Sequence, residues 1–374
     1  MNQGAVPSTP QRLRIGSHVA RYPIVQGAMA VQVSGAKLAG AVAQTGGVGV
    51  ISSLGLGLHS PYFEPRSRHS NFFRANQLAL IDELQAARAI SPTGVIGVNI
   101  LVATRNYPAL AQTAAANGAN LIITAAGLPL SLPEYTAAYP KVALVPMVCG
   151  LDAVQTICQT WQERYDRLPD GFIVENSQAV GGHVGTTCDS FDSQIESLLP
   201  QIRAYLKKQW GVDLPLIAAG GIWDRLDAER MWAIAANGIQ VGTRFITTEE
   251  CDADRRFKER HLHASPADVV IVPSPVGKPA RALRNPFAEK AIAASPGLER
   301  RCIANCLESC LCRDTRKTYC ILQALATAAR GDVEHGLLFS GANLGRATQI
   351  TSVAEVIAEL IGLETAESFA LNSI

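Results

Sequence analysis

The chain has 374 residues and a net charge of +1, from 33 Lys and Arg against 32 Asp and Glu. This balance excludes a protein that binds nucleic acid or an anionic membrane through excess positive charge. Hydrophobic residues make up 48% and charged residues 17% of the chain, which predicts a large buried core and excludes a mainly disordered protein. The first residues lack a basic and apolar signal segment, so we expect a cytoplasmic protein.

Eight short apolar runs recur along the chain, each ending in small or polar residues, and amphipathic stretches follow most of them. The runs span residues 24–27, 48–52, 95–100, 121–124, 142–148, 172–175, 216–219 and 239–242. Strands that are apolar on both faces are typical of a parallel sheet covered by helices. Eight such units in sequence predict a (β/α)8 TIM barrel.

The connections predict several helices and one long loop. Helices are expected over 34–44 with Ser34 as N-cap, over 76–89, and over 224–236 with Asp224 as N-cap. The Gly-, Pro- and aromatic-rich segment 54–75 after the second strand predicts a long loop, a candidate lid on the C-terminal face.

The domain organisation follows from the position of the last strand. We expect a barrel over 1–250 and a mainly helical C-terminal extension over 251–374 that packs on it and ends in a helix from about Val353. The segment Gly341-Ala342-Asn343 is expected to fold back over the barrel mouth.

The ends of the first and sixth strands are candidate site segments, because barrel active sites lie where the strands end. The first strand leads into Gly27-Ala28-Met29, whose bare backbone suits a planar ligand or simply a tight turn. The sixth strand ends at Glu175 and leads into Gly181-Gly182-His183. A histidine flanked by glycine at a strand end suits a general base, and we place this role ahead of a structural one.

The seventh and eighth strands predict a phosphate site. The seventh ends in Ala219-Gly220-Gly221 and the eighth in Gly242-Thr243-Arg244. Free amides, a hydroxyl and a guanidinium all donate to an oxyanion, and this is the usual phosphate site of such barrels. Together with the surface at strands one and six, the site has the size of flavin mononucleotide (FMN) rather than of a small sugar phosphate.

The segments PIVQGAMA, VIGVNILV, VENSQAVGGHVG, PLIAAGGIWD and IQVGTRFITTEE resemble the nitronate monooxygenase (2-nitropropane dioxygenase) family, to which FMN-dependent enoyl-ACP reductases are related. The resemblance covers roughly residues 20–290. It implies His183 as the catalytic base that takes the proton from the carbon α to a nitro group. It also implies an FMN site made of Gly27, Ala28, Met29, Asn99, Glu175, Gly181, Gly182, Ala219, Gly220, Gly221, Gly242 and Thr243.

The implied activity is oxidation of alkyl nitronates or nitroalkanes with dioxygen. The alternative is a flavin reductase that uses NAD(P)H to reduce an enoyl thioester or a quinone, with an iron-sulfur cluster relaying electrons. A third hypothesis is a redox sensor or electron relay in which the cysteines are the working part. The partners implied are a small-molecule substrate, NAD(P)H or an electron-transfer protein, and a homodimer is left open. The segment 176–178 departs from the more usual Gly-rich, acidic approach to Gly-Gly-His.

Five of the nine cysteines lie within 302–320, as Cys302, Cys306, Cys310, Cys312 and Cys320. Spacing by four residues lines three thiols along one helical face or supplies ligands from an irregular turn. The absence of CxxC pairs and of histidine in this stretch disfavours zinc. A [4Fe–4S] cluster, with Cys312 spare, and buried free cysteines packed as small hydrophobes both remain open.

Overall fold

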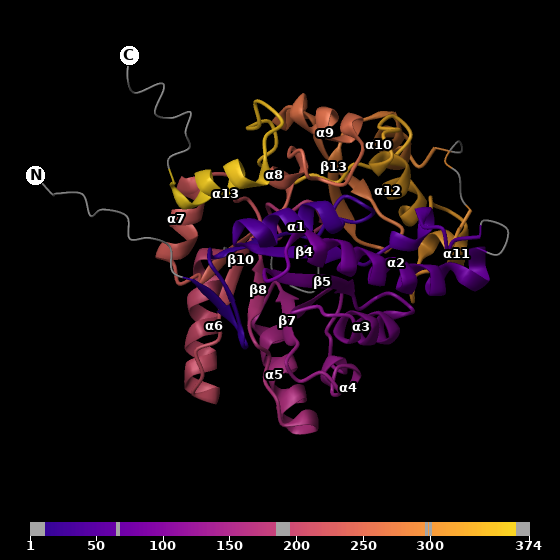
Figure 1. The fold of residues 1–374 in the computed structure, drawn as a ribbon. Helices are drawn as coiled ribbons and strands as arrows, with labels where there is room; N and C mark the ends of the chain where they lie inside the picture. Colours follow the sequence, from indigo (N-terminus) through magenta and orange to yellow (C-terminus); the bar gives the residue numbers. More distant parts are fainter. Residues whose placement is uncertain (1–11, 65–67, 185–194, 296–297, 299–300, 364–374) are drawn as a thin grey trace, which may run out of the picture.

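The computed structural model describes residues 12–64, 68–184, 195–295, 298 and 301–363, and eight parallel strands in it close into a barrel (Figure 1). The (β/α)8 barrel is therefore confirmed, and each predicted strand ends within one residue of an observed one. The strands are β3 (Ile24–Gln26), β4 (Val48–Ser52), β5 (Val95–Leu101), β6 (Leu121–Ala125), β7 (Ala143–Val148), β8 (Phe172–Glu175), β10 (Leu216–Ala219) and β11 (Gly238–Val241).

The barrel encloses an inner core of small and branched side chains, including Val25, Val50 and Ile173, because alternate residues of each strand face inward. The strand residues that face outward pack against the surrounding helices. A hairpin of β1 (Leu13–Ile15) and β2 (His18–Ala20) adds three buried side chains to the inner core. The inner core is thus solid below the mouth.

The helices of the barrel differ from the sequence predictions mainly at their first residues. They are α1 (Ala36–Thr45), α2 (Arg68–Ile90), α3 (Tyr107–Ala116), α4 (Leu132–Tyr135), α5 (Leu151–Tyr165), α6 (Ile195–Trp210), α7 (Arg225–Ala233) and α8 (Thr243–Ile246). Asp224 caps α7 as predicted, in a reciprocal pair with Asp227.

The long loop predicted over 54–75 is shorter than expected. Residues Leu56–His59 form a 3₁₀ helix, and α2 begins at Arg68 rather than at residue 76. Phe72, which is 1% exposed, packs in one hydrophobic cluster with Leu54 and Leu58. This burial extends the helix toward its N-terminus.

Helix α1 is capped by carboxylates that are distant in the sequence. Its N-cap is Gly35 and not Ser34, whose hydroxyl lies 2.9 Å from Gln26 Nε2. Asp252 accepts hydrogen bonds from the amides of Gly35, Lys37 and Leu38 at 2.8 to 3.1 Å, and Glu83 accepts one from Ala36. Burial raises the pKa of both carboxyls.

Replacing Asp252 by alanine is expected to lower the free energy of unfolding by about 1–3 kcal/mol, because three amides at the start of α1, two of them in part-buried hydrogen bonds, lose their acceptor. The matched control is Asp254→Ala, which removes the exposed carboxylate that caps α9 (Arg255–Leu262) and should cost about 1 kcal/mol or less. Urea unfolding of both variants checks this. Equal losses would contradict the assigned role of Asp252.

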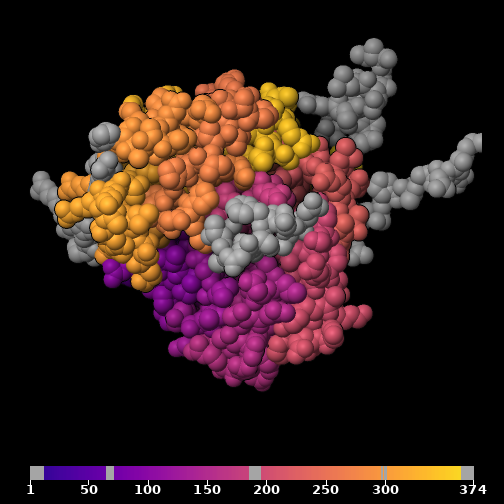
Figure 2. All heavy atoms as spheres, turned by 180° about the vertical axis from the view of Figure 1, so that it is seen from behind, coloured from indigo at the N-terminus to yellow at the C-terminus, as the bar shows by residue number. Residues whose placement is uncertain are grey.

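The chain after β11 covers the C-terminal end of the barrel, where it forms the orange and yellow upper part of Figure 2. It contains α8, α9, a hairpin of β12 (Val269–Pro273) and β13 (Pro279–Leu283), α10 (Pro286–Ile292), α11 (Leu311–Thr315), α12 (Ile321–Ala329) and α13 (Val353–Ile361). Helix α13 starts at the predicted residue and packs against α1 and α7, with its buried side chains in the outer core of the barrel.

The segment between α8 and α13 begins and ends at the same place, because residues 249–250 are hydrogen-bonded to residues 351–353. The Glu249 amide donates to Thr351 O at 2.9 Å, and the Val353 amide donates to Glu250 Oε2 at 3.0 Å. The division into domains at residue 250 stays a prediction. Among the described residues, no helix is both long and apolar enough to cross a membrane.

Candidate active site

Four of the predicted site residues lie on the inner face of the barrel at its C-terminal end, namely Asn99, Glu175, Ala219 and Ala28. On β8, Ile173 belongs to the inner core and Phe172 and Val174 to the outer core, so alternation turns Glu175 inward. Asn99 is inward on β5 by the same argument, and its Nδ2 lies 3.9 Å from Met147 Sδ.

Ala219 belongs to the inner core and Ala28 packs against it. The structure thus places these two small residues on the same inner face as Asn99 and Glu175. Burial raises the pKa of Glu175 to about 7, well above the usual range of a carboxyl group.

His183 is held at the mouth by the C-terminal hairpin. Gly182 and His183 form the short strand β9, which pairs with Arg281 and Ala280 of β13. Arg281 also donates to the carbonyls of Val180 and Gln178, which fixes the approach to the Gly-Gly-His motif. The local structure of this motif therefore depends on residues about a hundred positions further along the chain.

The surroundings of His183 keep its imidazole neutral. Its Nε2 lies 2.7 Å from the hydroxyl oxygen of Ser274, and its ring meets the Phe339 ring edge-on at 5.3 Å between centroids. Burial and, to a smaller extent, the charge of Lys278 lower the pKa of His183 to about 4. The imidazole is therefore unprotonated at neutral pH and able to accept a proton.

The predicted phosphate segments form a surface without side chains. Gly220 has φ +99°, and a Cβ there would lie 2.7 Å from Val180 Cγ1 and 2.9 Å from Asn176 O. At the neighbouring strand end, the Gly27 amide donates to Val241 O at 2.7 Å. Among the described residues, a Cβ on Gly242 would meet only Met29 Sδ, at 3.9 Å, so the described part of the chain leaves open space above this glycine.

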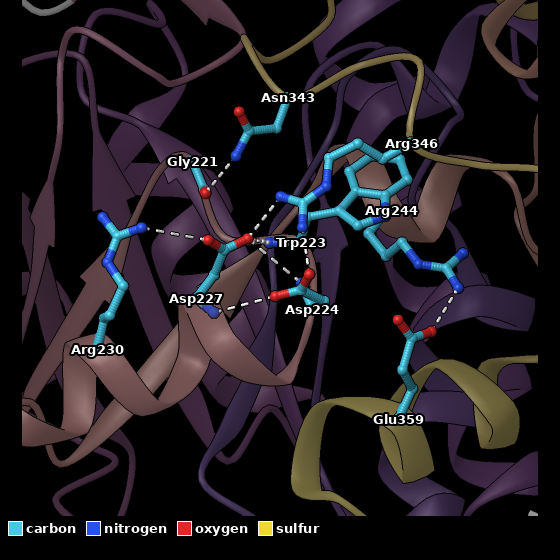
Figure 3. A network of polar contacts seen from close by, with 9 residues as sticks. All are labelled: Gly221, Trp223, Asp224, Asp227, Arg230, Arg244, Asn343, Arg346 and Glu359. Atoms are coloured by element: carbon cyan, nitrogen blue, oxygen red, sulfur yellow. Dashed lines mark hydrogen bonds and ion pairs between the residues drawn. The ribbon is translucent and has the colours of Figure 1, made fainter.

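The segment 341–346 closes the side of the site formed by the loops after β10 and β11. The Gly341 amide donates to Thr243 Oγ1 at 2.9 Å, and Asn343 Nδ2 donates to Gly221 O at 2.5 Å (Figure 3). Arg346 lies between the carboxylates of Asp224 and Asp227 at the start of α7. The prediction that residues 341–343 fold back over the mouth is thus confirmed.

The guanidinium of Arg244, which the sequence predicts near a phosphate, is held instead by a tryptophan ring and a carboxylate of α13. Its guanidinium stacks over the Trp223 ring at 5.4 Å from the centroid, and its Nη2 lies 2.9 Å from Glu359 Oε2 of α13 (Figure 3). Both interactions turn the guanidinium toward α13.

The residues present fit FMN. Gly220 and Gly221 both have positive φ and packed surroundings that leave no room for a side chain, so their backbone stays bare at the end of β10. The open space over Gly242 is bordered by Met29. Within the described part of the chain, the Asn99 amide meets one weak sulfur acceptor at 3.9 Å, so it can also donate to a heteroatom of a planar ring.

The cysteines of the C-terminal region lie in an irregular loop and at a helix start. Cys302, Cys306 and Cys310 lie on the non-helical segment 302–310, so the alternative of one helical face is wrong. Cys320 is the N-cap of α12 and forms a side-chain hydrogen bond with Cys302. We call these four residues the four-cysteine cluster. Within the described ranges, no three His, Cys, Asp or Glu side chains are arranged to hold a metal ion.

Sequence reasoning missed the residues that surround His183, namely Ser274, Lys278 and Phe339. The stretch Val269–Pro273, rich in β-branched residues, and the following turn with Gly277 were a hairpin signal that could have located Ser274 and Lys278. Nothing local marks Phe339 as a neighbour of His183, because the contact joins positions far apart in the chain.

The barrel and the glycines at its strand ends define the class of protein, an α/β barrel with its candidate site at the C-terminal mouth. The sequence model of nitronate monooxygenase matches residues 12–362, and the chain belongs to this family.

Probable nitronate monooxygenases of Staphylococcus haemolyticus and Staphylococcus saprophyticus are 34% and 31% identical over 122 and 121 residues, which are 31% and 32% of this chain. The matches span 32% and 34% of the length of those relatives.

Two solved structures share the fold over nearly the whole chain. FabK from Thermotoga maritima superposes with a TM-score of 0.69 at 23% identity, covering 94% of this chain and 96% of that one. Nitroalkane oxidase from Streptomyces ansochromogenes superposes with a TM-score of 0.65 at 20% identity, covering 95% and 98%.

Proposed function

We propose that the protein is an FMN-dependent oxidoreductase that oxidises nitroalkanes and alkyl nitronates with dioxygen. The observation that carries the proposal is a neutral, half-buried His183 at the mouth of a barrel whose glycine-lined strand ends fit FMN. Membership of the nitronate monooxygenase family supports it. When bound, FMN supplies the electron acceptor for the substrate and passes the electrons to dioxygen.

The residues of the chain would bind the cofactor and move one proton. Gly181, Gly182, Gly220, Gly221, Gly242 and Thr243 would hold the ribityl and phosphate parts, with Gly27, Ala28, Met29, Asn99, Glu175 and Ala219 around the ring. His183 would take the proton from the carbon α to the nitro group. When Nε2 donates to the Ser274 hydroxyl, Nδ1 is the nitrogen that would accept this proton.

The proposal is tested with the purified chain in two steps. Titration with FMN should produce a flavin absorption spectrum of the bound form, and the complex should consume dioxygen when a nitroalkane is added. Bleaching of the flavin by NAD(P)H under anaerobic conditions, together with no reaction with nitroalkanes, would instead establish the reductase alternative. Failure to bind FMN would overturn both.

The charge of Lys278 predicts a shift in the pH dependence of nitroalkane oxidation. Because this charge contributes to the low pKa of His183, Lys278→Met should raise that pKa. Activity is lost as pH falls through the pKa of the base, so the acid limb of kcat/KM should move to higher pH, by roughly half a unit. Lys278→Arg keeps the charge and should leave the limb in place; an unchanged profile in Lys278→Met would refute the coupling.

A further inference from the structure

His261 is a buried histidine that the proposed proton transfer does not use. It lies on α9 and is 0% exposed. Its Nδ1 lies 2.9 Å from the carbonyl oxygen of Phe257, one turn earlier in the same helix, and its Nε2 lies 3.1 Å from the carbonyl oxygen of Phe339. The imidazole thus connects α9 with the residue whose ring meets His183.

The partners of His261 determine which of its ring nitrogens donates. Both partners are carbonyl oxygens, which only accept hydrogen bonds, and a neutral imidazole carries one N–H donor. The Phe257 carbonyl is also the regular acceptor of the His261 amide, because the two residues lie four positions apart in α9. We therefore assign the hydrogen to Nε2, which donates to the carbonyl of Phe339.

Phe339 joins the small sheet that carries His183. It forms an antiparallel bridge with Ala282 of β13, the strand that pairs with His183 of β9. Hydrogen bonds at 2.8 and 3.3 Å between β13 and the residues on either side of Phe339 flank this bridge. In such a pair the N–H and C=O groups of the bridged residue point away from the partner strand. The Phe339 carbonyl therefore faces away from β13, on the side where His261 supplies a donor.

The ring of Phe339 covers one side of the His183 imidazole. The two rings meet edge to face, with 5.3 Å between centroids and 74° between planes. A Cβ on Gly182 would lie 3.2 Å from Phe339 Cδ2, so the glycine before His183 lets the ring approach the motif. Because the ring keeps water from this side, it contributes to the burial that lowers the pKa of His183.

We propose that His261 is a positioning residue that holds the Phe339 ring against His183. The hydrogen bond from Nε2 fixes the Phe339 carbonyl, and the bridge to β13 fixes the other side of the same residue. With its backbone held from both sides, Phe339 keeps its ring beside the imidazole. The importance of this arrangement for turnover rests on the proposed function, in which His183 is the base. The contacts themselves involve residues of the chain alone.

The charged groups that act on the two histidines are positive. Lys278 acts on His183, and Arg281 of β13 donates to two carbonyls in the approach to the Gly-Gly-His motif. Arg260 acts on His261 and donates at 2.7 Å to a carbonyl that follows β13. Burial and these charges lower the pKa of both histidines, so both imidazoles are neutral at neutral pH. His261 therefore acts through its hydrogen bond and not through a charge.

The test measures the pKa of His183 by NMR titration of its imidazole in the full chain, with His183→Asn to assign the signal. His261→Leu removes the donor and keeps an apolar side chain of moderate size, so Phe339 loses one of its two attachments. We expect the pKa of His183 to rise by roughly one unit toward the ordinary value of a histidine. His261→Gln retains an N–H donor at the position of Nε2, and most of the original pKa should return.

Phe339→Leu tests the path of the effect. Without the aromatic ring, the pKa of His183 should rise by a similar amount. Adding His261→Leu to this variant should change the pKa little further, because both substitutions remove the same contact. The matched control is His335→Leu. His335 is exposed and hydrogen-bonded to Asp332, so this substitution should leave the pKa of His183 unchanged.

A merely structural role predicts a different result, in which His261→Leu lowers the melting temperature and leaves the pKa of His183 in place. That result overturns the proposal, as do equal shifts in His261→Leu and His261→Gln or fully additive shifts in the double variant. If His261→Leu does not fold, His261→Asn, whose shorter side chain withdraws the donor from Phe339, takes its place. Because the titration requires no substrate, failure of nitroalkane oxidation would refute the proposed function and leave this result intact.

Discussion

Replacing His183 by asparagine is expected to lower kcat/KM for a neutral nitroalkane by about 10²–10⁴-fold, the usual contribution of a general base. The α-carbon of a nitroalkane must lose a proton, and the proposal assigns its removal to the neutral imidazole of His183 at the mouth. A preformed alkyl nitronate has already lost this proton. Its oxidation should therefore fall much less in the same variant.

Steady-state oxygen consumption with both substrates checks this difference. The control is Ser274→Ala, which keeps the base and removes the hydroxyl 2.7 Å from Nε2, and it should give a smaller loss than His183→Asn. An equal loss with the nitroalkane and its nitronate would show that His183 binds the substrate and does not act as a base. Unchanged FMN affinity in both variants shows that the site is intact.

Replacing Gly220 by alanine is expected to abolish retention of FMN. The new Cβ would lie 2.7 Å from Val180 Cγ1 and 2.9 Å from a backbone oxygen, in a backbone conformation with φ +99°. The loop after β10 must move, and with it the proposed phosphate site. We expect the dissociation constant for FMN to rise by at least about 100-fold, which corresponds to roughly 2.7 kcal/mol.

Gly118→Ala is the control that separates the effect of backbone strain from the effect of the steric clash in Gly220→Ala. Gly118 has φ +87°, and a Cβ added there would meet nothing within 4 Å, so this variant carries similar strain in open space. It should lose about 1–2 kcal/mol of stability and bind FMN as the unmodified chain does. Fluorescence titration measures the FMN affinity of both variants. Normal FMN affinity in Gly220→Ala would show that the phosphate lies elsewhere.

The strands could be predicted because their signal is local. Each barrel strand is a short apolar run flanked by glycine, proline or polar residues, and Val48–Ser52 and Leu216–Ala219 are found as predicted. The cap of α7 is equally local, since Asp224 and Asp227 are three residues apart.

The features that sequence reasoning missed depend on long-range contacts. Asp252 caps α1 from more than two hundred residues away, so Ser34 was the better local candidate and the wrong one. The polar partner of His183, Ser274, lies 91 residues downstream. The early start of α2 follows from burial of Phe72, which the local pattern of polar and aromatic residues does not indicate.

The chain leaves the barrel near Glu250 and returns to it near Thr351, at a point where the two ends are hydrogen-bonded to each other. Helix α13, which follows this return, supplies the outer covering that the last strand would otherwise lack. The intervening segment is thus an insertion within the final strand–helix unit. Its ends are already joined, so exchanging or lengthening it imposes little additional closure entropy on the barrel. Since this insertion supplies Ser274, Phe339 and Gly341 to the mouth, evolution can alter the reaction specificity without rebuilding the scaffold.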